Sequence, residues 1–285
     1  MSQVIERIAR AKINLALHIV GQREDGFHLI DSIVTFSQFG DRVRIETSKL
    51  SELISLKING PFAVDLSNDE NNLVFKAAEL LACHTLNLQP VQITLEKNLP
   101  IASGIGGGSA DAAATLLALS EFWKVDADLQ KLASELGADV PMCLVSKPLR
   151  ATGVGDETSI LEGVNSLPIL LVNPGVGVST PEVFQALASK SNAPISTMDK
   201  GTFPSCIDLK SLRNDLQEPA CNLEPMIGDV ISALERTRPL LARMSGSGAT
   251  CFAIYESDTS ALAAREAIKR EYPSWWCVAT KTVAN

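Results

Sequence analysis

Apolar and polar residues alternate near the start of the chain, over residues 11–20. A period of two residues predicts a β-strand, because successive side chains of a strand point to opposite faces of a sheet. Lys12 and Asn14 fall on one face of this strand, so two polar groups project in the same direction from a rigid element. Further strands are predicted at residues 41–47, 54–59, 91–96, 167–172 and 276–283.

Segments with helical spacing of the apolar residues alternate with these strands. Gly137 is expected to cap one such helix, and Thr180 and Pro181 are expected to open another as its N-cap and first helical residue. The apolar residues 138–146 are expected to return to the sheet, whereas residues 192–205, rich in Ser, Thr, Pro and Asn, predict a loop. Helices are predicted at residues 72–85, 108–123, 128–136 and 260–271.

The periodic pattern weakens around the glycine-rich residues 153–156, which suggests a boundary between two domains. A helical pattern resumes from residue 209. We therefore predict an N-terminal domain over residues 1–156 and a smaller C-terminal domain over residues 157–285. Strands and packed helices occur in both parts, which is typical of the α+β fold class.

Composition and charge narrow the classes of function. The chain has 285 residues, a formal net charge of −8 and a pI of about 5.0, which argues against nonspecific binding to nucleic acid or to an anionic membrane. A phosphate ligand would have to be held by backbone donors and a few placed cations. Six cysteines without a C-x-x-C pair favour buried free thiols in a reducing compartment, so we expect a cytoplasmic protein.

A glycine-rich loop gives the strongest chemical signal. It follows the predicted strand 91–96 and opens the predicted helix 108–123, where backbone N–H groups and the helix dipole favour an anion. No Gly-Lys-Ser/Thr follows, so it is not a Walker A motif, and Ser109 replaces the last glycine of a dinucleotide fingerprint. The alternative is a flexible turn before a packed helix. The loop consists of Pro100, Ile101, Ala102, Ser103, Gly104, Ile105, Gly106, Gly107, Gly108, Ser109 and Ala110.

A second glycine turn precedes a predicted strand, with Gly246, Ser247 and Gly248 at its centre. Taken alone, it is better interpreted as a tight hairpin or a bulge. Beside the first loop, it could close over the same ligand from the other domain. The sequence leaves both interpretations open.

Asp139 lies in a Gly-Ala-Asp-Val-Pro segment, after a predicted helix cap and before an apolar run. A carboxylate in this place is either the side chain of an Asx-turn or a general base. Lys12 is either a solvated strand residue or a cation that holds a carboxylate ionised and in place. The sequence alone does not establish that the two residues pair.

Taken together, these motifs resemble the GHMP small-molecule kinases. The resemblance rests on K-I-N-L near the N-terminus, P-x-x-x-G-x-G-G-G-S, G-A-D-V-P and S-G-S-G-A. Its most specific part is A-K-I-N-L followed by G-Q-R-E-D-G-F-H, and it extends over nearly the whole chain, weakening in residues 192–205. It implies a two-domain fold, with an N-terminal domain like ribosomal protein S5 domain 2 and a smaller α+β domain.

The resemblance also implies an activity and its residues. Asp139 would be the catalytic aspartate and Lys12 its partner. ATP would be the co-substrate with Mg²⁺, whose ligands stay open, Ser109 and a nearby carboxylate being only candidates. Residues near the adenine would be Asn72, Leu73 and Lys97, while the first glycine loop and Gly246, Ser247 and Gly248 would bind the nucleotide.

The implied acceptor is a small molecule with a cytidine diphosphate portion, phosphorylated on the 2-hydroxyl of a methylerythritol unit in the non-mevalonate route to isopentenyl diphosphate. Phe27 and Phe184 would sandwich the cytosine, and His28 would hydrogen-bond it. The chain would act without nucleic acid or membrane, as a monomer or weak homodimer. Asn14, Thr180 and Pro181 would line the same acceptor site.

Two departures from the family pattern accompany these assignments. Phe27 stands where many members carry Tyr, and Ala102–Ser103 stands where relatives often have two glycines. One alternative is another GHMP kinase acting on a mevalonate-like, homoserine or sugar substrate. A second is a non-catalytic nucleotide-binding protein on the same fold, against which the intact Lys12 and Asp139 argue.

Overall fold

The computed structural model describes residues 3–49, 52–64, 66–85, 88–195 and 201–285. The chain forms two compact units, and each is assembled from several segments. Helices and strands are mixed in both units, which confirms the predicted α+β class. Unit 1 comprises Met1–Ala11, Phe39–Ile101 and Gly106–Ser146. Unit 2 comprises Lys12–Gln38, Ala102–Ile105 and Lys147–Asn285.

The sheet of unit 1 is centred on β4 (Val91–Glu96). β4 pairs in parallel with β3 (Ile54–Asn59) and antiparallel with the second half of β2 (His28–Thr47). β1 (Val4–Gln22) pairs with β2, and both of these long strands continue into unit 2. The strands predicted at residues 54–59 and 91–96 are confirmed.

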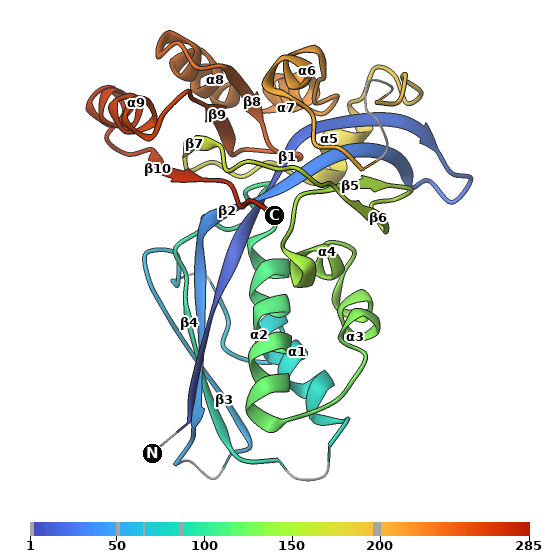
Figure 1. The fold of residues 1–285 in the computed structure, drawn as a ribbon, viewed down its shortest axis with the longest axis vertical. Coiled ribbons are helices and arrows are strands. Elements are labelled where there is room, and N and C mark those ends of the chain that lie inside the picture. Colours follow the sequence, from blue (N-terminus) through green and yellow to red (C-terminus); the bar gives the residue numbers. More distant parts are fainter. Residues whose placement is uncertain (1–2, 50–51, 65, 86–87, 196–200) are drawn as a thin grey trace. The chain divides into compact units, whose positions relative to one another are not determined.

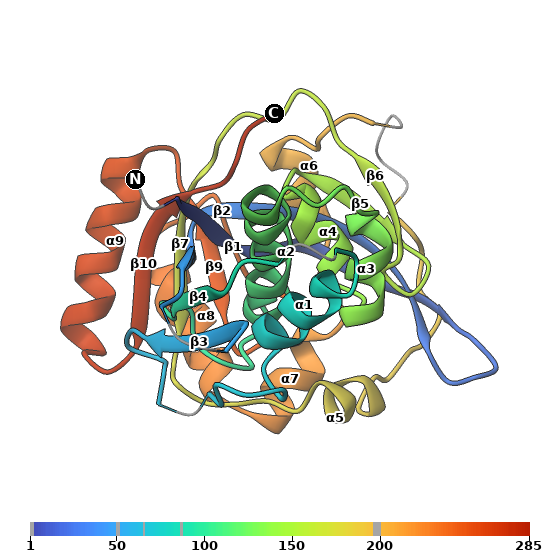
Figure 2. The same ribbon diagram turned by 90° about the horizontal axis from the view of Figure 1, so that it is seen from below.

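The helices of unit 1 pack around α2 (Gly107–Trp123), which lies beside α1 (Leu73–Ala82) (Figures 1 and 2). α3 (Leu129–Leu136) and α4 (Val140–Val145) also contact α2. Most residues of α2 are buried, many of them alanines, and a helix that is apolar on all sides belongs in a core. The first glycine loop therefore leads into the most firmly packed helix of this unit.

Unit 2 contains a four-stranded antiparallel sheet in the order β10-β7-β9-β8. The helices α8 (Met226–Arg236) and α9 (Asp258–Glu271) cover one face, where alternate residues of β7 such as Leu170 and Val172 join the hydrophobic core (Figure 1). The strands are β7 (Pro168–Asn173), β8 (Leu241–Met244), β9 (Cys251–Ile254) and β10 (Trp276–Lys281).

Shorter elements complete unit 2. β5 (Leu149–Thr152) pairs with the first half of β2 and forms a hairpin with β6 (Glu157–Ile160). The glycine-rich residues 153–156 are therefore a hairpin loop inside unit 2. The predicted division into domains at residue 156 differs from these compact units and stays a prediction. The remaining helices are α5 (Thr180–Gln185), α6 (Cys206–Ser211) and α7 (Gln217–Leu223).

The prediction that residues 138–146 return to the sheet is wrong, because they form the short helix α4. A short apolar run fits a buried strand or a buried helix equally well by pattern. Pro141 lies in the first turn of α4, where its missing N–H and fixed φ favour a helix. Likewise, α5 begins at Thr180 with Ser179 as its N-cap, one residue before the predicted cap. Residues 196–200 of the predicted loop lie outside the described residues.

Candidate active site

Residues Ala102–Ile105 of the first glycine loop belong to unit 2, where they touch the second glycine turn. A Cβ atom added at Gly104 would lie 2.6 Å from the carbonyl oxygens of both Ser245 and Gly248, so only glycine fits there. Thr250 N–H also donates to the carbonyl of Ser103 over 3.1 Å. The sequence placed these two glycine segments about 140 residues apart, and the fold brings their backbones together.

The second glycine turn joins β8 to β9. Ser245 N–H donates to the carbonyl of Thr250 (2.9 Å), and Gly248 N–H donates to the carbonyl of Ser245 (3.1 Å). Gly246 has a φ of 56°, and a Cβ atom there would lie 2.8 Å from the carbonyl oxygen of Gly104. The interpretation as a hairpin turn is confirmed, while its role toward a ligand stays a prediction.

The polar residues of β1 lie against both glycine segments. Lys12 N–H donates to the carbonyl of Ile105 (2.8 Å), and Asn14 N–H donates to the hydroxyl of Ser245 (3.1 Å). The Asn14 side chain donates to Ser32 Oγ (2.8 Å), but its buried Oδ1 has no hydrogen-bond partner among the described residues. A buried acceptor left unpaired costs about 1–3 kcal/mol, so this oxygen is suited to receive a hydrogen bond from a ligand.

The second half of the first glycine loop opens α2 in unit 1. Gly106, with a φ of 64°, precedes the helix, and Gly107, Gly108 and Ser109 are its first three residues. The N–H groups of a first helical turn have no acceptor within the helix, and the helix dipole places positive potential there. Ala110 N–H already donates to the carbonyl of Gly106 (2.9 Å). This geometry suits a phosphate group.

A buried ion cluster lies behind this helix start. Lys97 Nζ donates to Asp41 Oδ2 (2.5 Å) and to Asp111 Oδ2 (2.6 Å), and the three side chains are at most 4% exposed. Asp41 Oδ1 also accepts the N–H group of Leu99 (2.7 Å). A Cβ atom at Gly107 would be 3.1 Å from Lys97 Nζ, so the ammonium lies directly against the first residue of α2.

Burial and mutual attraction shift the pKa values of this cluster in opposite directions. Burial raises the pKa of Asp111 to about 8, despite the nearby Lys97. Burial alone would lower the pKa of Lys97, but attraction to Asp111 and Asp41 raises it. The Lys97 ammonium is therefore held between two buried carboxyl groups. Sequence analysis did not identify Asp41 or Asp111, because they lie 56 and 14 residues from Lys97 and no local pattern links them.

Two other residues assigned to the adenine lie at the start of α1. The Asn72 side chain caps this helix, accepting from Val74 N–H (2.9 Å) and donating to the carbonyl of Ser67 (2.8 Å). Leu73 Cδ1 would be 3.5 Å from a Cβ atom at Gly108. Leu73 therefore lies beside the start of α2, whereas the side chain of Asn72 already makes these hydrogen bonds.

Asp139 occupies the N-cap position of α4 in unit 1 and is partly buried. Its side chain makes no capping hydrogen bond to the first turn of that helix. The carboxylate is therefore not used as the cap, which leaves the interpretation as a catalytic base in place. The predicted pairing of Asp139 with Lys12 joins residues of the two units and stays a prediction.

The residues assigned to the acceptor gather in unit 2 around the β1–β2 turn and α5. The rings of His28 and Phe184 lie 4.9 Å apart, and buried His28 Nε2 has no hydrogen-bond partner among the described residues. Burial and the nearby Lys190 lower the pKa of His28. Phe27 is 64% exposed.

The helix α5 is also tied to the second glycine turn. Thr180 Oγ1 lies 2.7 Å from Ser247 Oγ, so α5, which also carries Pro181, is hydrogen-bonded to that turn.

Comparisons with known proteins agree with these motifs. Residues 72–147 match the model of the GHMP kinases N terminal domain, and residues 202–274 match that of GHMP kinases C terminal. The chain is 47% identical over 283 residues to the 4-diphosphocytidyl-2-C-methyl-D-erythritol kinase of Brucella abortus, covering 96% of this chain and 94% of that protein. The chain belongs to the GHMP kinase family. The resemblance predicted from the motifs is thus confirmed.

Other relatives of this GHMP kinase give the same picture. A 4-diphosphocytidyl-2-C-methyl-D-erythritol kinase of Sinorhizobium medicae is 48% identical over 290 residues, with 97% of this chain and 95% of that protein covered. A crystal structure of 4-(cytidine 5'-diphospho)-2C-methyl-D-erythritol kinase matches with a TM-score of 0.82 at 31% identity, covering 99% of this chain and 100% of that one. Homoserine kinase from Cytophaga hutchinsonii, at 20% identity and a TM-score of 0.70, shares the fold.

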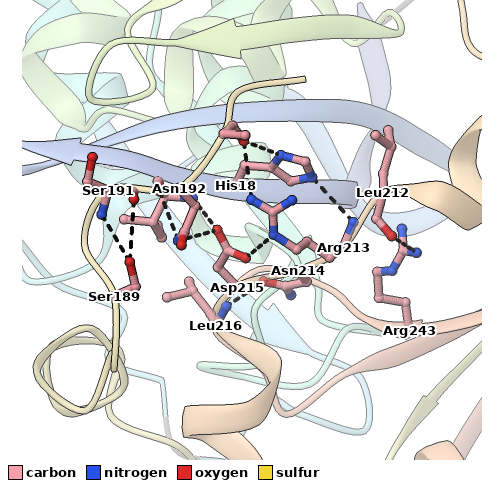
Figure 3. Close-up of polar contacts among 12 residues, drawn as sticks. His18, Ser189, Ser191, Asn192, Leu212, Arg213, Asn214, Asp215, Leu216 and Arg243 are labelled. Atoms are coloured by element: carbon pink, nitrogen blue, oxygen red, sulfur yellow. Dashed lines mark hydrogen bonds and ion pairs between the residues drawn. The ribbon is translucent and has the colours of Figure 1, made fainter. Parts of the chain in front are cut away.

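The sequence analysis missed a polar cluster of this GHMP kinase that joins β1 to residues 212–216 (Figure 3). His18, 2% exposed, donates from Nδ1 to the carbonyl of Ala193 (3.1 Å) and accepts Arg213 N–H at Nε2 (3.3 Å). These two partners require the neutral imidazole with its proton on Nδ1. Burial lowers the pKa of His18, and Arg213 lowers it further against the opposite effect of Asp215.

The stability of the kinase should therefore depend on the protonation of His18. Its folded pKa lies below its ordinary value of 6.5, so between these two values the unfolded chain binds the extra proton. This contribution to stability is complete above pH 6.5 and is lost as the pH falls toward the folded pKa. Urea unfolding from pH 5 to 8 should show a smaller pH dependence for His18→Asn than for the unmodified chain. The exposed His84 is the control, since an equal change in His84→Asn would contradict the assignment.

The described part of the chain contains neither a metal-binding cluster nor a membrane-spanning helix. Within it, no three His, Cys, Asp or Glu side chains lie together in a way that could hold a metal ion. None of its helices is both long enough and apolar enough to cross a membrane.

Proposed function

We propose that this GHMP kinase transfers the γ-phosphoryl group of ATP to the 2-hydroxyl of 4-diphosphocytidyl-2-C-methyl-D-erythritol. This reaction is a step of the non-mevalonate route to isopentenyl diphosphate. The observation that carries the proposal is the 47% identity to a kinase of that name over 96% of the chain. The unpartnered polar atoms of Asn14 and His28 and the open helix start at Gly107 support it from the geometry.

Positioning and charge stabilisation do most of the work in phosphoryl transfer, because its transition state is loose. The N–H groups of Gly107, Gly108 and Ser109 bind phosphate oxygens at the start of α2, where they need no reorganisation during the reaction. Asp139 orients the acceptor hydroxyl and takes its proton. We assign Lys12 the role of the cation that positions the reacting groups.

Mg²⁺ belongs to this proposal as the partner of the ATP phosphates, whose charge it neutralises when bound. Mg²⁺ is usually held by one or two protein oxygens together with substrate phosphates and water. The residues present fit that pattern, since the described part of the chain offers no dedicated cage and Ser109 offers a hydroxyl in the first turn of α2. The other ligands of Mg²⁺ would be phosphate oxygens of the nucleotide and water.

The acceptor is recognised through its cytosine, far from the reacting hydroxyl. The ring of Phe184, held against His28, and the exposed ring of Phe27 supply apolar faces for a base. The unpartnered His28 Nε2 supplies a hydrogen bond to its edge. We assign Asn14, Thr180 and Pro181 to the remainder of the acceptor. With the acidic composition, this assignment describes a cytoplasmic enzyme of small molecules, acting without nucleic acid and as a monomer or weak homodimer.

Replacing Phe27 separates stacking from core packing, because this ring is 64% exposed. Phe27→Ala should raise the KM for the acceptor by about 5- to 100-fold, which corresponds to a stacking contribution of about 1–3 kcal/mol. The KM for ATP and the melting temperature should stay nearly unchanged. Phe184→Ala should raise the same KM, but with a loss of stability, because Phe184 also packs on the core. An unchanged acceptor KM in both variants would refute the stacking role.

The choice of acceptor tests the proposed function against the other GHMP kinases. ADP release should be measured with the cytidyl acceptor, with methylerythritol phosphate lacking the cytidine, with mevalonate and with homoserine. Efficient turnover is expected only with the cytidyl acceptor. Comparable or faster turnover with mevalonate or homoserine would assign the chain to a different activity of this family.

A further inference from the structure

The second glycine turn is held from within unit 2 by a side chain to which the reaction gives no role. Asn214 Nδ2 donates to the carbonyl of Met244 (2.9 Å) and to the carbonyl of Gly246 (2.8 Å). Its Oδ1 accepts the N–H group of Leu216 (3.0 Å), and the residue is 7% exposed. One amide group therefore joins residues 214–216 to both sides of Ser245.

Asn214 is itself fixed to β1, the strand that carries Lys12 and Asn14. Leu17 N–H donates to the carbonyl of Arg213 (2.9 Å), and Asp215 N–H donates to the carbonyl of Leu17 (2.8 Å). Asp215 Oδ2 accepts the N–H group of Ile19 (2.7 Å). Residues 213–215 thus run along β1 and carry the amide of Asn214 toward the glycine turn (Figure 3).

Arg243 lies on β8, just before the second glycine turn, and binds both β1 and the start of residues 212–216. Its guanidinium donates to the carbonyls of Leu15 (2.6 Å) and Leu212 (2.6 Å) while being 6% exposed. Burial lowers the pKa of Arg243 to about 10, which still leaves it charged at neutral pH. The segment that carries Asn214 is therefore held by several buried hydrogen bonds.

The direction of these hydrogen bonds decides which groups of the turn are available to a ligand. The carbonyls of Met244 and Gly246 point to Asn214, so their negative ends face the interior. The N–H groups of Ser245 and Gly248 are used inside the hairpin. Those of Gly246 and Ser247 have no protein acceptor among the described residues, and successive free N–H groups form an anion-binding concavity.

We propose that Asn214 is a positioning residue of this kinase, which keeps the second glycine turn in the conformation that binds the nucleotide phosphates. This rests on the proposed function in so far as the turn, with Gly246, Ser247 and Gly248, contacts ATP. Only a side-chain amide has two donors for the two carbonyls and an acceptor for Leu216. An aspartate has the same shape, but as a carboxylate it would turn an oxygen toward both carbonyls.

The test compares nucleotide binding by Asn214→Asp, Asn214→Ala and the unmodified chain, with calorimetry of a non-hydrolysable ATP analogue and Mg²⁺. Both variants should bind the analogue about tenfold more weakly, the loss expected from one misplaced hydrogen bond of about 1.4 kcal/mol. The loss in Asn214→Asp should grow as the pH rises and the new carboxyl group ionises. The KM for the acceptor should change less than twofold.

Asn192→Ala is the matched control. Asn192 Nδ2 also joins two acceptors in this cluster, the carbonyl of Ile19 (3.1 Å) and Asp215 Oδ2 (3.0 Å), without touching the glycine turn. This variant should lose stability in urea while binding the analogue like the unmodified chain. An affinity unchanged in folded Asn214→Ala, or lowered equally in Asn192→Ala, would overturn the proposal. If Asn214→Asp does not fold, Asn214→Ala decides.

These outcomes are distinguishable from a failure of the proposed function. The calorimetric test uses the nucleotide alone and does not depend on the identity of the acceptor. A chain that binds the analogue but phosphorylates a different acceptor would refute the assignment of the substrate and leave the role of Asn214 intact.

Discussion

Asp139→Asn is expected to lower kcat by about 10²- to 10⁴-fold, the usual contribution of a positioned acid–base group. Asparagine keeps the size of the side chain but cannot take the proton of the acceptor hydroxyl. Because asparagine has the same shape as aspartate and would fit the N-cap position of α4 equally well, the melting temperature should change little. The KM for ATP should also stay within about threefold, since the proposed nucleotide contacts are backbone groups of α2 and of the second glycine turn. Steady-state kinetics with both substrates measure these effects.

The control for this variant is Asp128→Asn. Asp128 is the N-cap of α3 in the same unit, and its side chain accepts Lys131 N–H over 3.1 Å. Asparagine is an equally good N-cap, so both kcat and stability should be retained. Full turnover by Asp139→Asn would reject Asp139 as the catalytic group. A parallel loss of turnover in both variants would show that the effect is not specific to Asp139.

Lys97→Met is expected to have the largest effect on stability, a loss of about 3–5 kcal/mol in the free energy of unfolding. The substitution leaves the buried carboxyl groups of Asp41 and Asp111 without their cation. It also removes the ammonium that lies against Gly107, so nucleotide binding should weaken in the fraction that folds. Urea unfolding at pH 7 measures the loss.

Two further variants make this prediction specific. Lys281→Met breaks an ion pair with Asp258 of 2.7 Å whose side chains are 42% and 52% exposed, so it should cost less than about 1 kcal/mol. Adding Asp41→Asn to Lys97→Met should recover part of the stability, because the buried side chain left without its cation is then neutral and keeps an oxygen for the N–H group of Leu99. A loss in Lys97→Met no larger than that in Lys281→Met would show that the cluster does not stabilise unit 1.

The sequence predicted most elements whose pattern is local. The alternation over residues 11–20 identified β1, and the glycine loop marked the start of α2 within one residue. It failed at α4, because six apolar residues fit a strand or a helix until tertiary packing decides. The hairpin of β5 and β6 was missed because β6 is an exposed, polar strand without an apolar face.

The residues of the site also fall into some that the sequence reveals and others that it does not. Glycines at a strand–helix junction are visible in a sequence because the backbone conformation demands that residue type. The supporting groups are not, since Asp41, Asp111 and Asn214 are single polar residues whose partners are distant in the chain. Lys97 shows how far the role of a residue can be inferred from a family resemblance. Its position next to the nucleotide loop was indicated, but only the folded structure reveals that its ammonium contacts two buried carboxyl groups.

Ala102, one of the two departures from the family pattern in the first glycine loop, has a strained backbone conformation. Ala102 has a φ of 48°, a left-handed conformation that costs a non-glycine residue about 1–2 kcal/mol. A glycine at this position would avoid that cost, which the contacts of Ser103 and Gly104 with the second glycine turn must offset here.

Product analysis tests the kinase assignment most directly. The purified chain is incubated with Mg²⁺, γ-labelled ATP and 4-diphosphocytidyl-2-C-methyl-D-erythritol, and the products are identified by mass spectrometry and ³¹P NMR. We expect the label on the 2-hydroxyl of the acceptor, one ADP for each phosphorylated acceptor, and at least about 100-fold less of both products from Asp139→Asn in the same time. ATP bound by the folded chain but no label on the acceptor would contradict the assignment.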